Sequence, residues 1–230
     1  MSTKPLTVRL IYVAFAAAGL LAIVFFSFLM ARIVWPYTSG RLDIDFLLSK
    51  QRIVHFLHYR LAFYTHIFPA LLVLLAGLTQ FSGAILQRVP ALHRWVGRVY
   101  VYSILGVCGP AAIVMAWYAN GGPVAQASFL LLSIFWWVAT WTAYRAIRVG
   151  DIRKHGAWMI RSYALTLSAI TLRLMQFGLA QYSDIDPETA YRLVAWPSWV
   201  LNWAVAEVII RNTRWLAFIY GKPLLPLGAG

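Results

Sequence analysis

Charged residues are scarce in this chain, and acidic residues are the scarcest. Only 12% of its 230 residues are charged, and 7 Asp and Glu stand against 20 Lys and Arg. A soluble domain of ordinary composition has about 25% charged and roughly 45–50% apolar residues, whereas 61% of this chain is hydrophobic. A chain with so little charge cannot cover its apolar surface in water. The composition therefore excludes an ordinary soluble protein and indicates a membrane protein with several spans.

Cysteine is nearly absent as well. Cys108 is the single cysteine, so the chain can form no internal disulfide and no cysteine-based metal site. The sequence also lacks a nucleophile elbow, a glycine-rich phosphate loop, an acidic dyad and an H-E-x-x-H motif, which leaves hydrolase and kinase functions without support. The net charge of +13 is dispersed over short segments between apolar runs. Nucleic-acid binding, which needs a basic soluble surface, is therefore not expected.

Six long apolar runs make up most of the chain. Each is long enough for a helix that crosses the hydrocarbon core of a bilayer, which takes about 20 residues. We therefore predict an all-α polytopic membrane protein in which residues 1–230 form a single transmembrane domain. The bundle of six transmembrane helices is expected at about 10–35, 61–84, 95–118, 124–147, 158–181 and 193–215.

The basic residues are distributed unevenly between the two sides of this topology. Thirteen Lys and Arg fall on the side of the two termini and five on the other side. Since basic residues concentrate in cytoplasmic loops, both termini are predicted to be cytoplasmic, in the inner (plasma) membrane of a bacterium. Two local features are also predicted. These are a turn or short helix at the membrane interface around Phe46-Leu47-Leu48, and a kink at Gly109-Pro110, where proline removes a backbone donor.

Two basic stretches that contain a histidine lead into the third and fifth spans on the predicted cytoplasmic side. They run from His93 to Arg98 and from Arg153 to Arg161. Imidazoles from two neighbouring helices at one depth can ligate iron, and imidazole also suits copper and zinc. One hypothesis is therefore that His93 and His155 bind haem b or a transition metal. The side chains placed to pair with the haem propionates are Arg94, Arg98, Lys154 and Arg161.

A second group of histidines falls on the other side of the predicted topology. His66, together with His55 or His58, would hold another haem or metal there, and the two sites would form an electron path across the membrane. The protein would then be an electron-transfer protein or a membrane oxidoreductase, with a quinone or another redox protein as its partner. The alternative is that these histidines and arginines only bind lipid headgroups and fix the topology of a cofactor-free accessory subunit.

Arg173 supports a different class of function. If 158–181 is one straight helix, Arg173 lies on the same face as His155, because 18 residues are five turns, about 27 Å along the axis. An ionisable residue within a span normally faces the protein interior or a water-filled cavity. Glu207 of the sixth span is the nearest counter-charge expected for Arg173. With Gln80, these residues would line a polar cavity in a transporter or in a membrane protein that binds an anion or a lipid.

The two basic stretches also carry a family resemblance. The matching segments run from Leu92 to Tyr100 and from Gly150 to Tyr163, supported by Thr171-Leu172-Arg173 and by His66 ahead of Gln80-Phe81. Over roughly residues 50 to 215, the chain resembles a family of bacterial multi-pass membrane proteins catalogued as domain of unknown function 2306. The resemblance implies a membrane protein and gives no activity. The paired helix histidines are also loosely similar to those of haem-b membrane cytochromes and ferric reductases.

Overall fold

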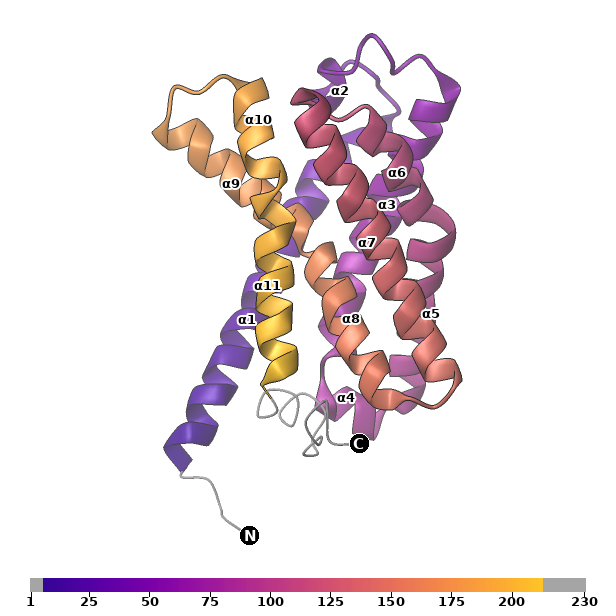
Figure 1. Cartoon of the computed structure of the whole chain (residues 1–230), viewed down its shortest axis with the longest axis vertical. Helices are drawn as coiled ribbons and strands as arrows, with labels where there is room; N and C mark the ends of the chain where they lie inside the picture. Colours follow the sequence, from indigo (N-terminus) through magenta and orange to yellow (C-terminus); the bar gives the residue numbers. More distant parts are fainter. Residues whose placement is uncertain (1–5, 213–230) are drawn as a thin grey trace.

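The computed structural model describes residues 6–212, which form helices and no strands (Figure 1). Six helices or pairs of consecutive helices are long and apolar enough to cross a membrane, which confirms the predicted fold class. They are α1 (Leu6–Val34), α3 (Leu57–Gln80), α5 with α6 (Pro90–Ser103, Gly109–Trp117), α7 (Gly122–Arg148), α8 with α9 (Ile152–Thr166, Ser168–Tyr182), and α10 with α11 (Pro187–Ala195, Pro197–Arg211).

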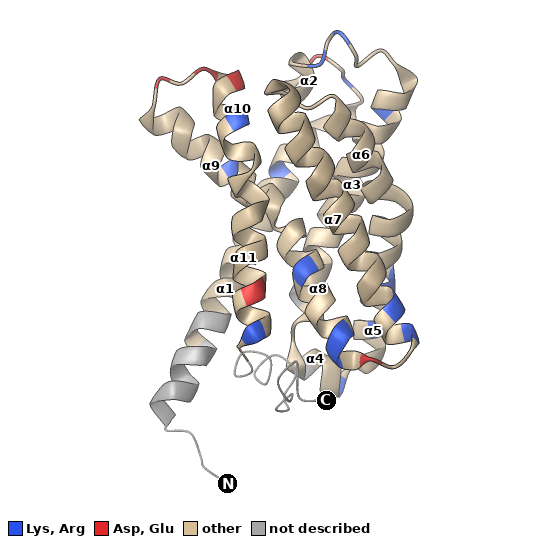
Figure 2. Ribbon diagram, in the orientation of Figure 1, with Lys and Arg blue, Asp and Glu red and all other residues tan. Residues whose placement is uncertain are grey.

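The two ends of the bundle differ in charge (Figure 2). We name the end that carries α4 (Gly83–Arg88), the start of α5 and the α7–α8 connection the basic face, and the other end the opposite face. The positive-inside bias predicts that the basic face is cytoplasmic. Lys4, Arg214 and Lys222, which contribute to that prediction, lie outside the described residues. The described basic residues at this face are Arg88, Arg94, Arg98, Arg145, Arg148, Arg153, Lys154, Arg161 and Arg211.

Two short elements, η1 (Trp35–Ser39) and α2 (Asp45–Leu48), cover the opposite face between α1 and α3. The helix α2 confirms the short helix predicted around Phe46-Leu47-Leu48. The Phe46 N–H donates to the Tyr37 hydroxyl at 3.1 Å, which ties α2 to η1. Leu47 is fully buried. It belongs to a small apolar cluster with Val54 and Phe63, so this layer forms a packed roof over the end of α3.

Helices α5 and α8 begin earlier than the predicted spans. Pro90 occupies the first position of α5, where its missing N–H would be unpaired in any case. Asp151 caps α8 by accepting a hydrogen bond from the Lys154 N–H at 2.9 Å, as helix N-cap residues do. His93 and His155 are therefore each the fourth residue of their helix, one turn inside it instead of ahead of it.

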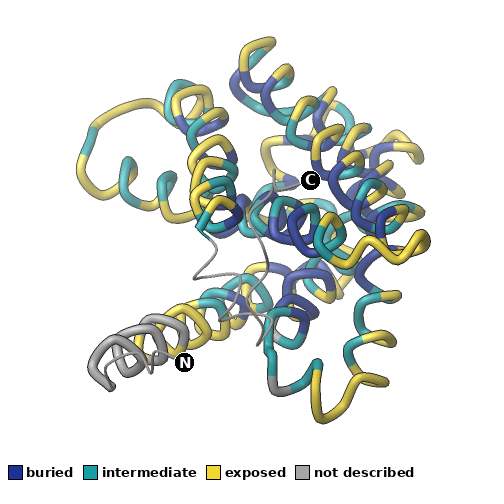
Figure 3. The backbone as a smooth tube through the Cα atoms, turned by 60° about the horizontal axis from the view of Figure 1, so that its bottom comes forward, coloured by how far each residue is buried: buried dark blue, intermediate teal, exposed yellow. Residues whose placement is uncertain are grey.

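The centre of the bundle is packed from α3, α5, α7 and α8, and the buried segments in Figure 3 concentrate where these helices meet. The Tyr163 ring lies so close to Gly77 that a Cβ at position 77 would overlap it. The Tyr163 hydroxyl donates to the Leu74 carbonyl at 3.0 Å, which fixes the ring in that place. Large apolar side chains stay exposed along the outside of all six spans, as expected for helices surrounded by lipid.

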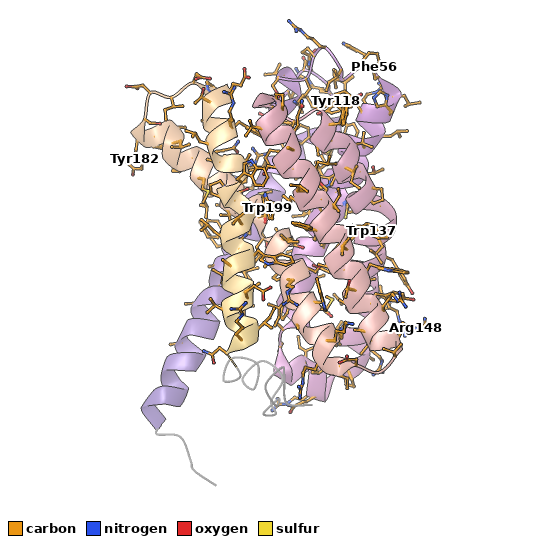
Figure 4. All side chains as sticks on the ribbon, viewed as in Figure 1. Phe56, Tyr118, Trp137, Arg148, Tyr182 and Trp199 are labelled. Carbon is orange, nitrogen blue, oxygen red and sulfur yellow. The ribbon has the colours of Figure 1, made fainter. Side chains whose placement is uncertain are left out.

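The predicted kink at Gly109-Pro110 is a π-helical turn, η2 (Ile104–Cys108), between α5 and α6. The Gly109 N–H bonds to the Ile104 carbonyl, and Pro110 has no N–H, so the Leu105 carbonyl has no regular backbone donor. The Trp137 indole of α7, labelled in Figure 4, donates to that carbonyl at 3.0 Å. A neighbouring helix therefore completes the hydrogen bonding that the proline leaves open.

The fifth span is bent where α8 ends and α9 begins, at Leu167. The Ala164 carbonyl accepts hydrogen bonds from the Asn202 side-chain amide at 3.1 Å and from the Ser168 hydroxyl at 3.4 Å. The Thr171 hydroxyl donates to the Asn202 Oδ1 at 3.1 Å. Side chains that bond to helix carbonyls compete with the backbone ladder and bend the helix.

This bend corrects the prediction of one straight polar stripe from His155 to Arg173. The five-turn argument requires an unbroken helix, whereas Figure 1 shows α9 leaning away from α8. The sequence contains no proline or glycine at the bend, and the competing amide comes from α11. Arg173 therefore belongs to a separate helix whose direction is set by the contact with α11.

We expect the Gly77→Ala variant to be destabilised, because its new methyl group collides with the buried Tyr163 ring. Overpacking of this kind typically costs about 1–3 kcal/mol. The Gly178→Ala variant is the matched control, since a Cβ at 178 has nothing within 4 Å. Thermal unfolding of both variants in detergent measures the effect. Equal unfolding temperatures for the two variants would contradict the close contact between Tyr163 and Gly77.

Candidate functional site

A cavity of about 270 Å³ lies inside the bundle, in the half nearer the opposite face. It is partly open and its wall is mostly apolar, with aromatic rings contributed by η1, α2, α3, α7 and α10. A largely apolar hollow with a few placed polar groups is the usual form of a small-molecule site. The polar and charged residues of the wall, with Trp136, are Tyr37, Tyr59, His66, Ser133, Thr166, Ser168, Arg173, Tyr191 and Ser198.

His66 of α3 offers this cavity a hydrogen-bond acceptor. Its Nδ1 lies 3.0 Å from the Cys108 carbonyl at the end of the π-helical turn. A carbonyl oxygen only accepts, so Nδ1 carries the proton and Nε2 keeps a free lone pair. No described residue bonds to Nε2, and the ring lines the cavity with its edge toward Trp136, 6.4 Å between ring centroids. The π-helical turn thus fixes which nitrogen of His66 is available.

Arg173 of α9 places a positive charge in the wall of the same cavity, at its exposed edge. Its Nη1 donates to the Gln176 Oε1 at 3.2 Å. The hydroxyls of Tyr37 and Tyr191 lie within electrostatic range of the guanidinium. The ion pairs formed by the described carboxylates do not include Arg173. A guanidinium within a span and without a carboxylate partner is a candidate anchor for an anionic ligand.

The structure separates Arg173 from the two residues predicted to share its cavity. Gln80, at the end of α3, donates to the His93 carbonyl at 3.3 Å on the side of the basic face. Glu207 of α11 forms a bidentate pair with Arg161, with oxygen–nitrogen distances of 2.6 and 3.0 Å. The prediction of a polar cavity lined by all three residues is therefore wrong. The cavity is mostly apolar, and of the three residues only Arg173 lines it.

The pair formed by Arg161 and Glu207 joins α8 to α11 near the basic face. Two indole rings flank the guanidinium, with its carbon 4.6 Å from the centroid of Trp158 and 5.9 Å from that of Trp203. Both charged side chains are about four-fifths buried, at 17% and 24% exposure. The charge of Arg161, predicted to pair with a propionate, is thus already balanced by a carboxylate.

A closed ring of hydrogen bonds, the hydroxyl ring, lies directly beside the cavity toward the basic face. The Trp136 Nε1 donates to the Thr166 hydroxyl at 3.0 Å, and the Thr140 hydroxyl donates to the Trp136 carbonyl at 2.8 Å. Tyr100 and Ser162 connect Thr166 to Thr140. The Tyr100 hydroxyl lies 3.0 Å from the Thr166 hydroxyl and 2.8 Å from the Ser162 hydroxyl. The Ser162 hydroxyl lies 2.7 Å from the Thr140 hydroxyl.

The donor of each bond in one half of the hydroxyl ring follows from the one proton that each hydroxyl carries. The Thr140 proton goes to a carbonyl, so Thr140 must accept from Ser162, and Ser162 in turn must accept from Tyr100. All five side chains are buried, and each hydroxyl has at least two hydrogen-bond partners; the Thr166 hydroxyl also lies 3.1 Å from the Ser162 carbonyl. A fully satisfied buried network fixes the relative positions of the helices that supply it, here α5, α7 and α8.

The structure brings His93 and His155 within electrostatic range of each other near the basic face. The Nδ1–H of His155 donates to the Ala143 carbonyl at 2.9 Å, which leaves its Nε2 as an acceptor. The Nδ1 of His93 is buried and has no partner among the described residues. Arg94 and Arg98, predicted to bind propionates, are exposed. His93 and His155 thus lie in the same part of the bundle, and each has a ring nitrogen without a hydrogen-bond partner among the described residues.

The histidines predicted to form a second site are dispersed. His58 is exposed and its Nε2 lies 2.9 Å from the Tyr118 hydroxyl, whereas His55 is exposed in the connection before α3. His66 is directed to Cys108 instead. Within residues 6–212 no group of three or more His, Cys, Asp or Glu could hold a metal ion, so the structure does not assemble these three imidazoles.

Lys50 forms a buried contact in the roof of the opposite face that the sequence did not indicate. Its side chain is 5% exposed, and its ammonium group donates to the Tyr118 carbonyl and to the Asn120 Oδ1. It also lies over the Phe46 ring, 5.4 Å from the centroid. Burial lowers the pKa of Lys50 from 10.5 to about 8. Lys50 thus ties the roof to the connection between α6 and α7.

Sequence reasoning also missed three members of the hydroxyl ring. Ser162 and Thr166 lie on the face of the fifth span that the 3.6-residue period picks out, but Tyr100, Trp136 and Thr140 occur in apolar runs that carry no local sign of a network. The available signal was a pair of spacings of four, 136 to 140 and 162 to 166. Such spacings place polar groups on one helix face, yet they do not say which faces meet.

Six membrane-length helices around a buried polar core define an integral multi-pass membrane protein. The chain belongs to the family of predicted membrane proteins described as DUF2306, which matches residues 63–210. This range runs from within α3 almost to the end of α11, contains His66, His93, His155 and Arg173, and confirms the resemblance seen in the sequence. Comparison with curated proteins and comparison with solved structures each gave no match.

We expect the Thr140→Ala variant to lose stability, because Ser162 loses the acceptor for its only proton. Removing one partner of a buried hydrogen bond costs about 1–2 kcal/mol in membrane and soluble proteins. Thr142→Ala is the matched control: its hydroxyl also donates four residues back, to the Val138 carbonyl at 2.8 Å, but forms no part of the ring. The free energy of unfolding in mixed detergent is the measurement, and equal losses in both variants would contradict the network.

Proposed function

We propose that this protein binds a small, mostly apolar anion within the membrane, in the cavity between His66 and Arg173, as a transporter or ligand-binding protein of a bacterial inner membrane. The observation that carries the proposal is Arg173 in the cavity wall without a carboxylate partner among the described residues. A cation inside a span is costly unless it is paired. An anionic ligand group would supply the missing pair.

The rest of the wall favours a compact ligand body with aromatic or branched aliphatic character. The rings of Phe46, Phe63, Phe129 and Trp136 and several aliphatic side chains surround the space. A volume of about 270 Å³ equals that of roughly nine liquid waters. It accommodates a single ring or a short chain. The free Nε2 of His66 would accept a hydrogen bond from a ligand hydroxyl.

We expect the Arg173→Gln variant to bind a small aromatic anion more weakly while keeping the fold. Benzoate serves as the probe, with benzamide as the uncharged molecule of the same shape. A charge-assisted hydrogen bond contributes about 1.5–3 kcal/mol, which corresponds to roughly 10- to 150-fold in affinity. Titration of the purified protein, followed through its intrinsic tryptophan fluorescence or by calorimetry, measures the difference between the two probes.

Arg32→Gln is the matched control, because Arg32, near the end of α1, is exposed as Arg173 is but does not line the cavity. Its removal should leave benzoate affinity unchanged. Wild-type protein that prefers neither benzoate over benzamide nor any other small apolar anion, or an Arg173→Gln variant with full affinity, would overturn the proposal. Mass spectrometry of the intact protein in gentle detergent adds a direct search for a co-purified acid.

A second candidate function is binding of haem b or a transition metal at His93 and His155. The specific observation is that two neighbouring imidazoles have unused nitrogen atoms, while the Nδ1–H of His155 is held by the Ala143 carbonyl. Metal-ligating histidines are usually oriented by such a bond on the other nitrogen. A haem here would pass electrons to a quinone or to a redox protein, with exposed Arg94 and Arg98 available to its propionates.

This second candidate predicts a bound cofactor that depends on both histidines. The purified protein should give a reduced-minus-oxidised haem spectrum and a pyridine haemochrome, or a stoichiometric metal by elemental analysis. His155→Ala and His93→Ala should abolish the signal, whereas His58→Ala, which removes an exposed histidine on the opposite face, should not. Absence of both haem and metal from protein expressed with adequate iron, copper and zinc would exclude this function.

A further inference from the structure

A second hollow, of about 630 Å³, opens on the opposite face just outside the cavity. Its walls come from the α6–α7 connection, the end of α9 and the start of α10, and include Asn120 and Gln176. Ala119 and Tyr191 line both the hollow and the cavity. The two spaces are therefore adjacent, and these two side chains stand between them.

Tyr191 is the larger of the two separating side chains and the one that can move. Its ring packs edge-on against Phe129, with 5.6 Å between centroids. No described residue forms a hydrogen bond with its hydroxyl group, which lies in the field of Arg173. A rotation of the ring about its two side-chain dihedrals would therefore break no hydrogen bond within residues 6–212. Ala119, by contrast, has no rotatable side chain.

Arg173 lies at the junction of the two spaces. It lines the cavity, while Gln176, which accepts its hydrogen bond at 3.2 Å, lines the hollow. Glu188 also lines the hollow, but Arg192 lies 3.4 Å from its carboxylate and donates to the Gly121 carbonyl. The negative charge at the rim is thus offset locally, and the guanidinium of Arg173 is the charge that an anion meets at the inner end of the hollow.

The side of the cavity toward the basic face is closed. Trp136 and Thr166 belong both to the cavity wall and to the hydroxyl ring. Behind them Ser162 and Thr140 are completely buried, and Tyr163 lies tightly against Gly77. No lining residue of the cavity lies beyond this layer. Water-borne access is therefore possible from the opposite face and is blocked from the basic face.

We propose that the hollow is the aqueous access route to the cavity and that Tyr191 is its gate. The positive-inside bias places this route on the extracytoplasmic side. The proposal rests on the proposed function, which supplies the ligand, and it narrows the ligand class. A molecule that arrives through water and passes between Tyr191 and Ala119 is a water-soluble monoanion with a compact apolar body, not a lipid that diffuses in from the bilayer.

The test uses a cysteine reporter and needs no knowledge of the ligand. Cys108, the single native cysteine, is replaced by alanine, and Ser133, which lines the cavity, becomes cysteine. The membrane-impermeant anion sulfonatoethyl methanethiosulfonate is added to the full-length protein in sealed vesicles, from one face at a time. Ser133→Cys should react only from the opposite face, several-fold faster with Tyr191→Ala and several-fold slower with Tyr191→Trp.

Two controls make the rates interpretable. Ser39→Cys, which is exposed on η1 and does not line the hollow or the cavity, should react at one rate in all Tyr191 variants. Arg173→Gln should reduce the preference for the anionic reagent over its trimethylammonium counterpart by roughly tenfold, as expected when a focusing charge is removed from a cleft. Should Ser133→Cys fail to fold, Ala116→Cys, also in the cavity wall, takes its place as the reporter.

Labelling from the basic face, or a rate that is the same in all Tyr191 variants, would overturn the gate. A reporter that reacts only with the lipid-soluble reagent N-ethylmaleimide would overturn it as well and would show access through the bilayer. The two proposals fail in different ways. Gated labelling without benzoate binding refutes the ligand and leaves the route, whereas benzoate binding that is indifferent to Tyr191 refutes the route and leaves the ligand.

Discussion

The hydroxyl ring constrains the rest of the structure, because it joins α5, α7 and α8 through bonds that each need a particular depth and rotation of the helix. Buried hydroxyl groups cannot form hydrogen bonds with water instead. A shift of any one helix by one residue would therefore leave several of them without a partner. The ring starts and ends on Trp136, whose indole and carbonyl serve it from one residue. Hydrogen bonds therefore set the register of the helices in the centre of this bundle. Apolar packing determines it less strictly, because lipid tails offer apolar side chains equally favourable contacts.

The cavity lies next to the hydroxyl ring, on the side toward the opposite face, where the helices are no longer joined by these bonds. Beyond the ring, α8 gives way to α9, and the direction of α9 is set by Asn202 of α11. On the other flank the π-helical turn presents the Cys108 carbonyl to His66. At both departures from the regular helix, a backbone carbonyl is bonded to a side chain of another helix. The candidate ligand-binding residues are positioned by these irregularities: one orients His66 and the other carries Arg173 away from the bundle centre.

The sequence predicted the all-helical class and the number of membrane-length helices, since long apolar runs have few alternatives in a chain with so few charges. It also located the short helix at Phe46 and the irregularity at Gly109-Pro110, which depend on local residues. It did not predict the bend at Leu167, because the competing amide belongs to Asn202, 38 residues after the Ala164 carbonyl that it bonds. For the same reason Glu207 was assigned to Arg173 instead of Arg161, and Lys50 was not seen as buried. Pairings between helices depend on rotation and depth, and a single sequence contains no signal for either.

The neighbouring imidazoles of His93 and His155 illustrate the same limit in another way. Their position near the basic face followed from the sequence, and the structure adds the hydrogen bond that orients one of them and the unused nitrogen atom of the other. The likeness of the two basic stretches thus corresponds to two helices that each carry a histidine at their fourth position.

The π-helical turn has a consequence for how this chain can change over evolutionary time. Pro110 withholds a donor from the Leu105 carbonyl, and the Trp137 indole on another helix supplies it. If Pro110 were replaced, a backbone N–H at position 110 could donate to the Leu105 carbonyl, and the Trp137 indole would no longer be needed there. If Trp137 were replaced while Pro110 stayed, the Leu105 carbonyl would be left unpaired inside the membrane. The two positions are therefore epistatic: the effect of a substitution at either one depends on the residue at the other, although 27 residues separate them. A lineage can exchange both together far more readily than it can exchange one.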